Sequence, residues 1–504
     1  MRIAAIFMTA VALLSGAISP AHGRDRWVEA RTDHFVILSN VGEEDTRALI
    51  TDLEYFRHYL SLLTKVDASV PAPPLYVVAV GRQSQFLKFI NNRELAGGYS
   101  ATFRGGVAVV NLNKSKSKFG RNGRCTLFHE YVHHFVRQYS HFRYPRWYDE
   151  GFADYLCTFQ VDDGVIKVGL PVAENFSALS RGRWLPVKTI LDSNKEYVTE
   201  HSRTSNAAWQ FYVQSWLMVH YFHSNAERGE QMVAYLKAAN EGMPVEAAFD
   251  QSFDISMDEL QKELSGYLWS KAMPYRQARF DDTNFLPQIR IRRLEGLEMD
   301  LALANARRML APMTGRMGQA VRAFDKVLKI EPDNVAALIG KADMLISKGE
   351  QEKAEPLLDR ALALDPENSW ALTNKGYLCL WRMDQLDDEA ARSEALEQGR
   401  QFLRKAILND PTNALAPYQL GRSYGWVEEW NAEEAEVAFR AAVALMPQLD
   451  GFKLMWAHYL HGSDQTGRAK ALYEELATWS LIDGVVQDSA SALEEIASQT
   501  TTAP

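Results

Sequence analysis

The stretch Cys125-Thr-Leu-Phe-His129-Glu130-Tyr-Val-His133-His-Phe-Val-Arg-Gln138 decides the fold of this chain. It lies in a segment with helical character, so we expect a helix over residues 125 to about 138. Residues four apart share one face of a helix, so the imidazoles of His129 and His133 can reach one zinc ion. Glu130 lies one step round the helix, where a general base would face a water at the metal.

A second run follows and reads Pro145-Arg-Trp-Tyr-Asp-Glu150-Gly-Phe-Ala-Asp154-Tyr155. Together the two runs resemble the gluzincin metallopeptidases, the clan of thermolysin and the zinc aminopeptidases. The resemblance implies that Glu150 is the third metal ligand and that Asp154 orients the first histidine. Two histidines, one carboxylate and one open position are typical of a catalytic zinc site.

The resemblance also extends to Tyr212, which begins a helical run that ends near Tyr221. In the aminopeptidase branch such a tyrosine binds the oxyanion; a tyrosine that only packs the domain is the open alternative. That branch also carries a Gly-x-Met-Glu-Asn strand that grips the free amine of its substrate. Here the comparable stretch, residues 97–106, reads GGYSATFRGG. The departure favours cleavage within a chain over removal of N-terminal residues.

The region before the first motif alternates strand and helix. The apolar, β-branched runs predict strands at 34–39, 75–80 and 106–111, with a helix over 43–63. Residues 124–270 are predicted to be helical. We therefore expect an α+β zincin-like domain, a small mixed sheet packed on helices, over residues 24–280.

The second half of the chain repeats. Pro332 and Pro366 are 34 residues apart, each preceded by an acidic residue, and the ending recurs at Pro411. Small and aromatic residues precede these endings at matching positions, among them Ala320 and Phe324. The period resembles tetratricopeptide repeats, whose helix pairs stack into a solenoid with a concave surface for a peptide or protein.

These observations divide the chain into segments. We expect an all-α repeat domain at 295–480, a linker at 281–294 and a C-terminal tail at 481–504. Residues 1–23 have one early basic residue, a short apolar run and a small-residue end, and they predict a cleaved signal peptide. The mature chain is then exported, periplasmic or secreted, and has no membrane span.

Composition narrows the function. With 55 Lys+Arg against 64 Asp+Glu, the net charge of −9 argues against a nucleic-acid partner. Residues 1–310 carry +2 and residues 311–504 carry −11, which suggests two units with different surfaces. The lysine-rich run at 114–118 is interpreted as a solvated loop. Of the other histidines, His134 is expected to pack or to lie at the surface, and His141, His220 and His223 are expected to be structural.

Three cysteines rule out a disulfide-dense scaffold. If the two motif helices run antiparallel, as the resemblance implies, Cys125 falls opposite Cys157. The pair can form a disulfide beside the metal site, and two buried thiols are the open alternative. Cys379 is left over in either case.

The leading hypothesis is an exported zinc-dependent peptidase in which Glu130 is the general base. The repeats would recruit a protein substrate or partner on their concave face. The alternative is a non-catalytic scaffold, in which a peptidase-like fold and the repeats mediate protein–protein interaction in the cell envelope.

Overall fold

The computed structural model describes residues 26–70, 72–113, 121–140, 142–192, 205–270, 273–280, 283–430 and 432–502. The predicted signal peptide at 1–23, the lysine-rich run at 114–118 and His141 lie outside these residues. None of the described helices is long and apolar enough to cross a membrane.

The described part of the N-terminal unit is built on a mixed sheet in the order β4-β5-β3-β2-β1-β9. β2 and β3 pair in parallel, as do β3 and β5, and the other neighbours are antiparallel. Three of these strands match the predicted runs. The strands are β1 (Trp27–Arg31), β2 (Phe35–Ser39), β3 (Leu75–Val80), β4 (Gly97–Thr102), β5 (Gly105–Asn111) and β9 (Arg290–Leu294).

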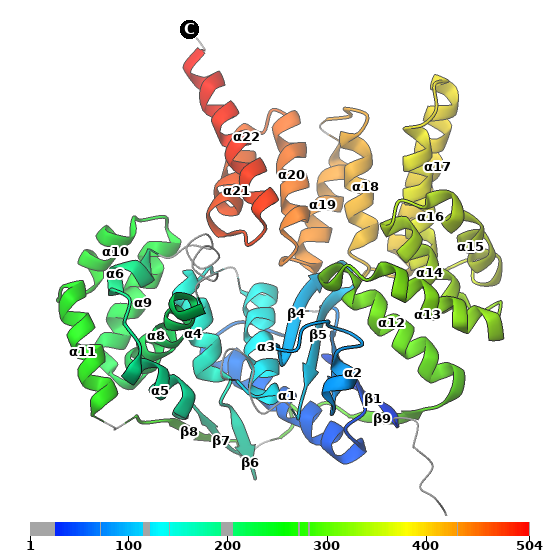
Figure 1. Cartoon of the computed structure of the whole chain (residues 1–504). Coiled ribbons are helices and arrows are strands. Elements are labelled where there is room, and N and C mark those ends of the chain that lie inside the picture. Colours follow the sequence, from blue (N-terminus) through cyan, green and yellow to red (C-terminus); the bar gives the residue numbers. More distant parts are fainter. Residues whose placement is uncertain are drawn as a thin grey trace, which may run out of the picture.

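Helices cover both faces of this sheet (Figure 1). Side chains alternate along a strand, so one set packs on α1 (Glu43–Thr64) and α3 (Gly123–Tyr139). The opposite set packs on α2 (Gln83–Phe86) and α12 (Gly296–Thr314). Because both faces are buried, β3 and β5 read as continuous apolar runs.

The helical layer that follows α3 contains a small second sheet. The prediction of helix throughout 124–270 was wrong at residues 160–168, because a turn with positive φ at Asp163 and Gly164 makes a hairpin. Its strands are β6 (Gln160–Asp162), β7 (Val165–Val168) and β8 (Arg276–Arg279). The helices are α4 (Arg146–Leu156), α5 (Ala173–Arg181), α6 (Val187–Leu191), α8 (Ser205–Ser224), α9 (Ala226–Asn240), α10 (Val245–Ser252) and α11 (Met257–Trp269).

The second half forms stacked helix pairs, as the 34-residue period predicts. At the repeat junctions Asn334 and Asn368 cap the next helix by accepting the N–H of Ala337 and Ala371. The helices are α13 (Met317–Ile330), α14 (Val335–Ser347), α15 (Gln351–Leu364), α16 (Ser369–Met383), α17 (Glu389–Asn409), α18 (Leu415–Gly425), α19 (Glu433–Leu445), α20 (Asp450–Gly462), α21 (Thr466–Trp479) and α22 (Asp483–Thr502).

Two predicted boundaries differ from the structure. The linker at 281–294 includes β9, which pairs with β1 along its whole length, from Trp27↔Leu294 to Arg31↔Arg290. The tail at 481–504 is mostly α22, whose Val485, Ala492 and Ile496 are buried against α20 and α21.

The helices from α12 to α22 form an arch over β4 and β5 (Figure 1). We call the side that faces the N-terminal unit the inner face; it includes Asp343, Trp370, Tyr418 and Phe452. The concave face was predicted to bind a peptide or protein; in the structure the β4–β5 turn packs there, and Phe103 belongs to the same cluster as Tyr418 and Phe452. Part of the inner face is therefore occupied by the chain itself.

Gly151 marks the closest approach of α4 to α8. A Cβ at this position would lie 2.4 Å from the carbonyl oxygen of Ser215, a backbone atom that cannot turn aside. We therefore predict that Gly151→Ala lowers the free energy of unfolding by about 1–3 kcal/mol, and with it the thermal unfolding midpoint.

Gly266 in α11 is the matched control, because a methyl group there meets nothing within 4 Å. Gly266→Ala should leave stability unchanged or raise it by up to ~1 kcal/mol, since alanine favours helix. Equal midpoints for the two variants would contradict the role assigned to Gly151.

Candidate metal centre

The start of α3 is set by its first residues. The Asn122 side chain accepts the N–H of Cys125 at 2.8 Å and so caps the helix. Gly123 lets the helix begin against β5, because a Cβ there would lie 1.9 Å from the carbonyl oxygen of Asn111. This start directs His129 and His133, one turn apart, into the interior, where both are buried.

α4 faces α3 across the site. Glu150 lies opposite both histidines, Asp154 lies opposite His129, and the next pair along is Cys125 and Cys157. Contacts that run backward along one helix and forward along the other belong to antiparallel helices. The structure therefore brings together the three predicted ligands and the predicted orienting carboxylate.

The three ligand atoms form a compact triangle. The Nε2 atoms of His129 and His133 are 3.2 Å apart, and Oε2 of Glu150 lies 3.3 Å from the first and 3.6 Å from the second. Tetrahedral zinc with ligand bonds of about 2.0–2.1 Å separates its ligand atoms by about 3.3 Å. The triangle therefore fits one face of a zinc coordination shell.

The other ring nitrogens face carboxylates. Nδ1 of His133 lies 3.1 Å from Oδ1 of Asp149, and Nδ1 of His129 lies 2.9 Å from Oδ1 of Asp154. The second contact is close, although its angle falls outside that of a hydrogen bond. A carboxylate at Nδ1 favours the proton there and leaves the Nε2 lone pair free for a metal.

The arrangement of these three ligand atoms is suited to a bound cation. Two Nε2 lone pairs and a carboxylate oxygen converge, and none of the three supplies a proton when both histidines are neutral. Among the described residues, His129, His133 and Glu150 are the group of histidine, cysteine and carboxylate side chains that could hold a metal ion. The residues fit zinc in donor type, in number and in spacing.

Each acidic side chain at the site also contacts its own arginine. Arg121 bonds Asp154, Nη2 of Arg137 lies 2.8 Å from Asp149, and Nη2 of Arg146 lies 3.3 Å from Oε1 of Glu150. The two carboxylate oxygens of Glu150 thus have different partners: Oε2 faces the histidines and Oε1 faces Arg146.

These contacts keep the buried carboxyls ionised. Burial raises the pKa of Glu150, but its interactions with His129 and His133 and the charge of Arg146 outweigh burial and hold the pKa well below its ordinary range. Burial likewise opposes the charge of Asp154, and Arg121 and His129 lower its pKa. An ionised Glu150 can act as a metal ligand without first losing a proton.

Glu130 and Tyr212 lie around this centre. Glu130 is partly buried on α3. Burial raises the pKa of Tyr99 in β4, and the negative charge of Glu130 raises it further. Tyr212 lies inside α8, which begins at Ser205, and not at the start of the helix as predicted; it interacts with Arg146. The charge of Glu150 and burial raise the pKa of Tyr212 to about 12, so its hydroxyl holds its proton at neutral pH.

The sequence analysis did not identify four of these residues: Asp149, Arg121, Arg137 and Arg146. Asp149 immediately precedes the third ligand, and its position on α4 was the one signal that could have indicated its role. Arg146 lies one turn before Glu150 on α4, a spacing that could have indicated their ion pair. Arg121 and Arg137 stand at no diagnostic spacing, because their pairing depends on how α3 and α4 face each other.

Three further histidines from the sequence analysis have structural partners. His134 is buried, with Nδ1 3.0 Å from the hydroxyl of Tyr99. His220 is held by the hydroxyl of Tyr267 and the carbonyl of Gly169. His223 packs between Phe152 and Tyr155.

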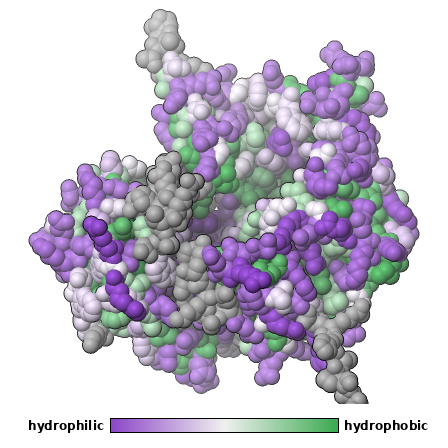
Figure 2. Space-filling model, viewed as in Figure 1, coloured by the Kyte–Doolittle hydropathy of each residue, from purple (hydrophilic) through white to green (hydrophobic). Residues whose placement is uncertain are grey.

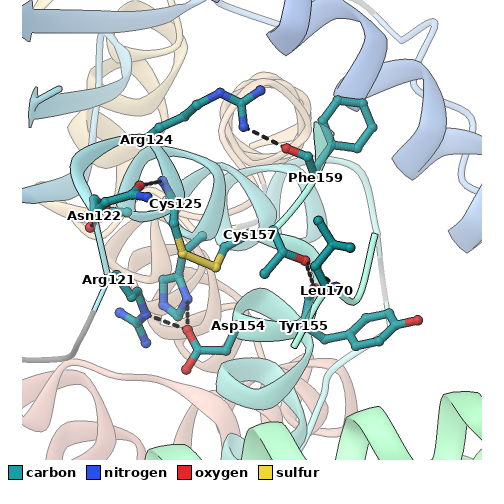
Figure 3. The surroundings of a disulfide bond; sticks show 12 residues. Arg121, Asn122, Arg124, Cys125, Asp154, Tyr155, Cys157, Phe159 and Leu170 are labelled. Atoms are coloured by element: carbon teal, nitrogen blue, oxygen red, sulfur yellow. Dashed lines mark hydrogen bonds and ion pairs between the residues drawn. A yellow bond between two sulfur atoms is a disulfide. The ribbon is translucent and has the colours of Figure 1, made fainter. Parts of the chain in front are cut away.

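Figure 3 shows the disulfide between Cys125 and Cys157 beside Asp154 and Arg121. Of the two alternatives left open by the sequence, the structure has the bridge, with the Cα atoms 4.6 Å apart. It joins α3 one turn before His129 to the end of α4, and it lines a cavity of about 730 Å³. The two helices that carry the candidate ligands are therefore covalently linked.

Comparisons with known proteins identify the repeats. The tetratricopeptide repeat family model matches residues 313–380, which confirms repeats of this kind in that part of the predicted region 295–480. Solved structures that are similar include a thermophilic tetratricopeptide-repeat protein of Thermus thermophilus, 22% identical, covering 39% of this chain and 99% of that chain, with a TM-score of 0.35. Another is PilF of Pseudomonas aeruginosa, 17% identical, covering 42% and 96%, with a TM-score of 0.31. No curated protein matches.

The bridge gives a direct prediction. Unreduced, denatured protein should titrate one thiol, that of Cys379, whereas three thiols would contradict the bridge. Replacing both Cys125 and Cys157 with alanine should lower the stability by ~3–4 kcal/mol, because the unfolded chain loses a closed loop. Cys379→Ala is the control. A reductant should lower the stability of this variant as much as it lowers that of the wild type, because the bridge is still present.

The carboxylates behind the histidines should set metal affinity. We predict that Asp154→Asn and Asp149→Asn each weaken zinc binding by about 10–100-fold, since each amide still fills the space but no longer carries the charge that supports the imidazole. Competition with a chromophoric chelator measures the effect. Asp163→Asn is the control, because Asp163 is almost fully exposed at the β6–β7 turn. Unchanged affinity in both site variants would contradict the assignment.

Proposed function

We propose that the N-terminal unit is a zinc-dependent peptidase of the gluzincin type, with a zincin-like fold. His129, His133 and Glu150 would hold the ion. The observation that carries the proposal is the triangle of two Nε2 atoms and one carboxylate oxygen, with sides of 3.2, 3.3 and 3.6 Å. A partly buried Glu130 on the same helix and a protonated Tyr212 on another add the groups that hydrolysis requires.

Bound zinc would supply Lewis acidity, which would polarise a substrate carbonyl and lower the pKa of water, so that water loses a proton more readily as it attacks that carbonyl. The carboxylate of Glu130 would accept a proton from the attacking water and pass it to the leaving amine. The hydroxyl of Tyr212 would donate a hydrogen bond to the oxygen that gains charge, and Arg146 would hold that hydroxyl in place.

The position of β4 favours a peptide as substrate. Among the described strands, β4 pairs with β5 alone, so its outer edge keeps unpaired backbone groups. Such an edge can bind an extended peptide as an additional strand. The hydroxyl of Tyr99 in β4 lies 3.0 Å from Nδ1 of His134 on α3, the helix that carries Glu130, so a peptide on this edge would lie near the candidate metal centre. Figure 2 shows a hollow below the arch, through which a chain can approach.

Export is part of the proposal. A disulfide beside a metal centre is stable in an oxidising compartment, and the predicted signal peptide would direct the chain there. Cleavage within chains is proposed over removal of N-terminal residues, because no acidic side chain lies in β4 to bind a free amine.

A second candidate function follows from the tetratricopeptide match at 313–380, since this repeat commonly forms protein-binding solenoids. In that case the chain is a scaffold for protein–protein interaction in the cell envelope and cleaves nothing. Both functions are compatible with one molecule if the repeats recruit the substrate of the peptidase.

We predict that the wild-type protein holds about one zinc ion per chain and cleaves an unfolded protein substrate. Glu130→Gln should keep the zinc and lose at least ~10²-fold of the rate, because the amide cannot accept a proton. Mass spectrometry of a peptide library and metal analysis measure the two results.

Glu94→Gln is the control, because Glu94 is exposed and lies outside the site. Cleavage by Glu130→Gln at the wild-type rate would overturn the mechanism. Two results together would favour the scaffold function. The zinc-loaded protein would cleave no peptide, and a partner protein would bind the wild type and Glu130→Gln equally.

A further inference from the structure

The turn between β4 and β5 carries a buried arginine into the inner face of the arch. The guanidinium of Arg104 forms an ion pair with Asp343 of α14, and both side chains are more than nine-tenths buried. It also lies over the ring of Trp370 in α16, 3.5 Å from the centroid. The adjacent Phe103 packs near the same ring, with centroids 6.3 Å apart.

The receiving site belongs entirely to the repeats. Asp343, Trp370, Arg308 and Asn374 come from α12, α14 and α16, elements far in sequence from the turn. Asp343 accepts hydrogen bonds from Nη1 of Arg308 at 3.2 Å and from Nδ2 of Asn374 at 2.7 Å, besides its contact with Arg104. Its carboxylate therefore keeps two donors if Arg104 leaves. A carboxylate beside an aromatic face is a built site for a guanidinium.

Arg104 is an imperfect occupant of this site. Its Nε is buried without a hydrogen-bond partner, and the like charge of Arg308 lies on the same carboxylate. Burial, followed by the charge of Arg308, lowers the pKa of Arg104 to about 9, against the attraction of Asp343. Each feature raises the free energy of the docked state, and each is relieved when Arg104 returns to water.

We propose that the inner face of the first repeats is a binding site for a protein segment that presents an arginine next to an aromatic residue at a turn. In the isolated chain Phe103 and Arg104 occupy the site, and the partner segment displaces them. In the absence of a tight-binding partner, the chain's own turn occupies the site, because a tethered turn has an effective concentration of the order of mM. A partner must therefore bind more tightly than the turn, for example by pairing the groups that Arg104 leaves unpaired.

Displacement of the β4–β5 turn by a partner segment would also affect the candidate metal centre. The turn continues into β4, whose Tyr99 contacts His134, the neighbour of His133. This link to catalysis rests on the proposed function, whereas the exchange does not. Binding and cleavage are measured separately, so failure of one is distinguishable from failure of the other.

The test uses the full chain and a defined probe, a fluorescein-labelled cyclic peptide with the sequence of residues 101–106, Ala-Thr-Phe-Arg-Gly-Gly. Fluorescence anisotropy measures its affinity. Arg104→Ala empties the site, so it should bind the probe at least ~10-fold more tightly than wild type. Adding Asp343→Asn to Arg104→Ala should abolish this gain, and a probe with alanine in place of arginine should not bind.

Two results would overturn the proposal: equal probe affinity of wild type and Arg104→Ala, or equal binding of the arginine and alanine probes. Circular dichroism checks that the variants fold. If Arg104→Ala does not fold, Arg104→Lys takes its place, because lysine keeps the charge but lacks the planar fork that stacks on Trp370. It should bind the probe more tightly than wild type, and an unchanged affinity would likewise exclude exchange.

Discussion

The structure depends on the burial of charge between α3 and α4. Two imidazoles and three carboxylates lie there, and an isolated charge of this kind would cost several kcal/mol to bury. The cost is offset because every acidic side chain has an arginine on one side and an imidazole on the other. This pairing fixes the two helices in one register, and the same register makes the Nε2 atoms converge. Stability and the candidate chemistry thus have a common origin.

The candidate ligands could be predicted because they follow helical spacing. His129 and His133 are one turn apart on α3, and Glu150 and Asp154 are one turn apart on α4, so a linear pattern contains each pair. Asp149, Arg121 and Arg137 could not be found in this way. Their contacts depend on how two helices meet, and no local pattern encodes that. The disulfide was left open for the same reason, since it requires Cα atoms close in space.

The three strands that were predicted are buried on both faces, whereas the two edge strands of this sheet, β4 and β9, were not predicted, and neither was β1. β2, β3 and β5 are continuous apolar runs, whereas β9 reads Arg290-Ile-Arg-Arg-Leu294 and was interpreted as a linker. Edge strands commonly carry charge, which prevents pairing with other chains and also hides the strand from a hydrophobic pattern. The helix in the tail at 481–504 was not predicted, although its Val485, Ala492 and Ile496 are buried.

The arch is attached to the N-terminal unit on both sides of β4, and this limits how either part can act alone. α12 covers one face of the sheet, while Gln448, just before α20, bonds both Tyr99 of β4 and Gln138 of α3. A further ion pair joins Arg143, beyond α3, to Glu475 of α21. The repeats therefore surround the strand that would bind substrate and contact the helix that carries both histidines. A protein that binds the inner face would contact the region around that strand, so the proposed recruitment by the repeats and access to the candidate metal centre would be coupled.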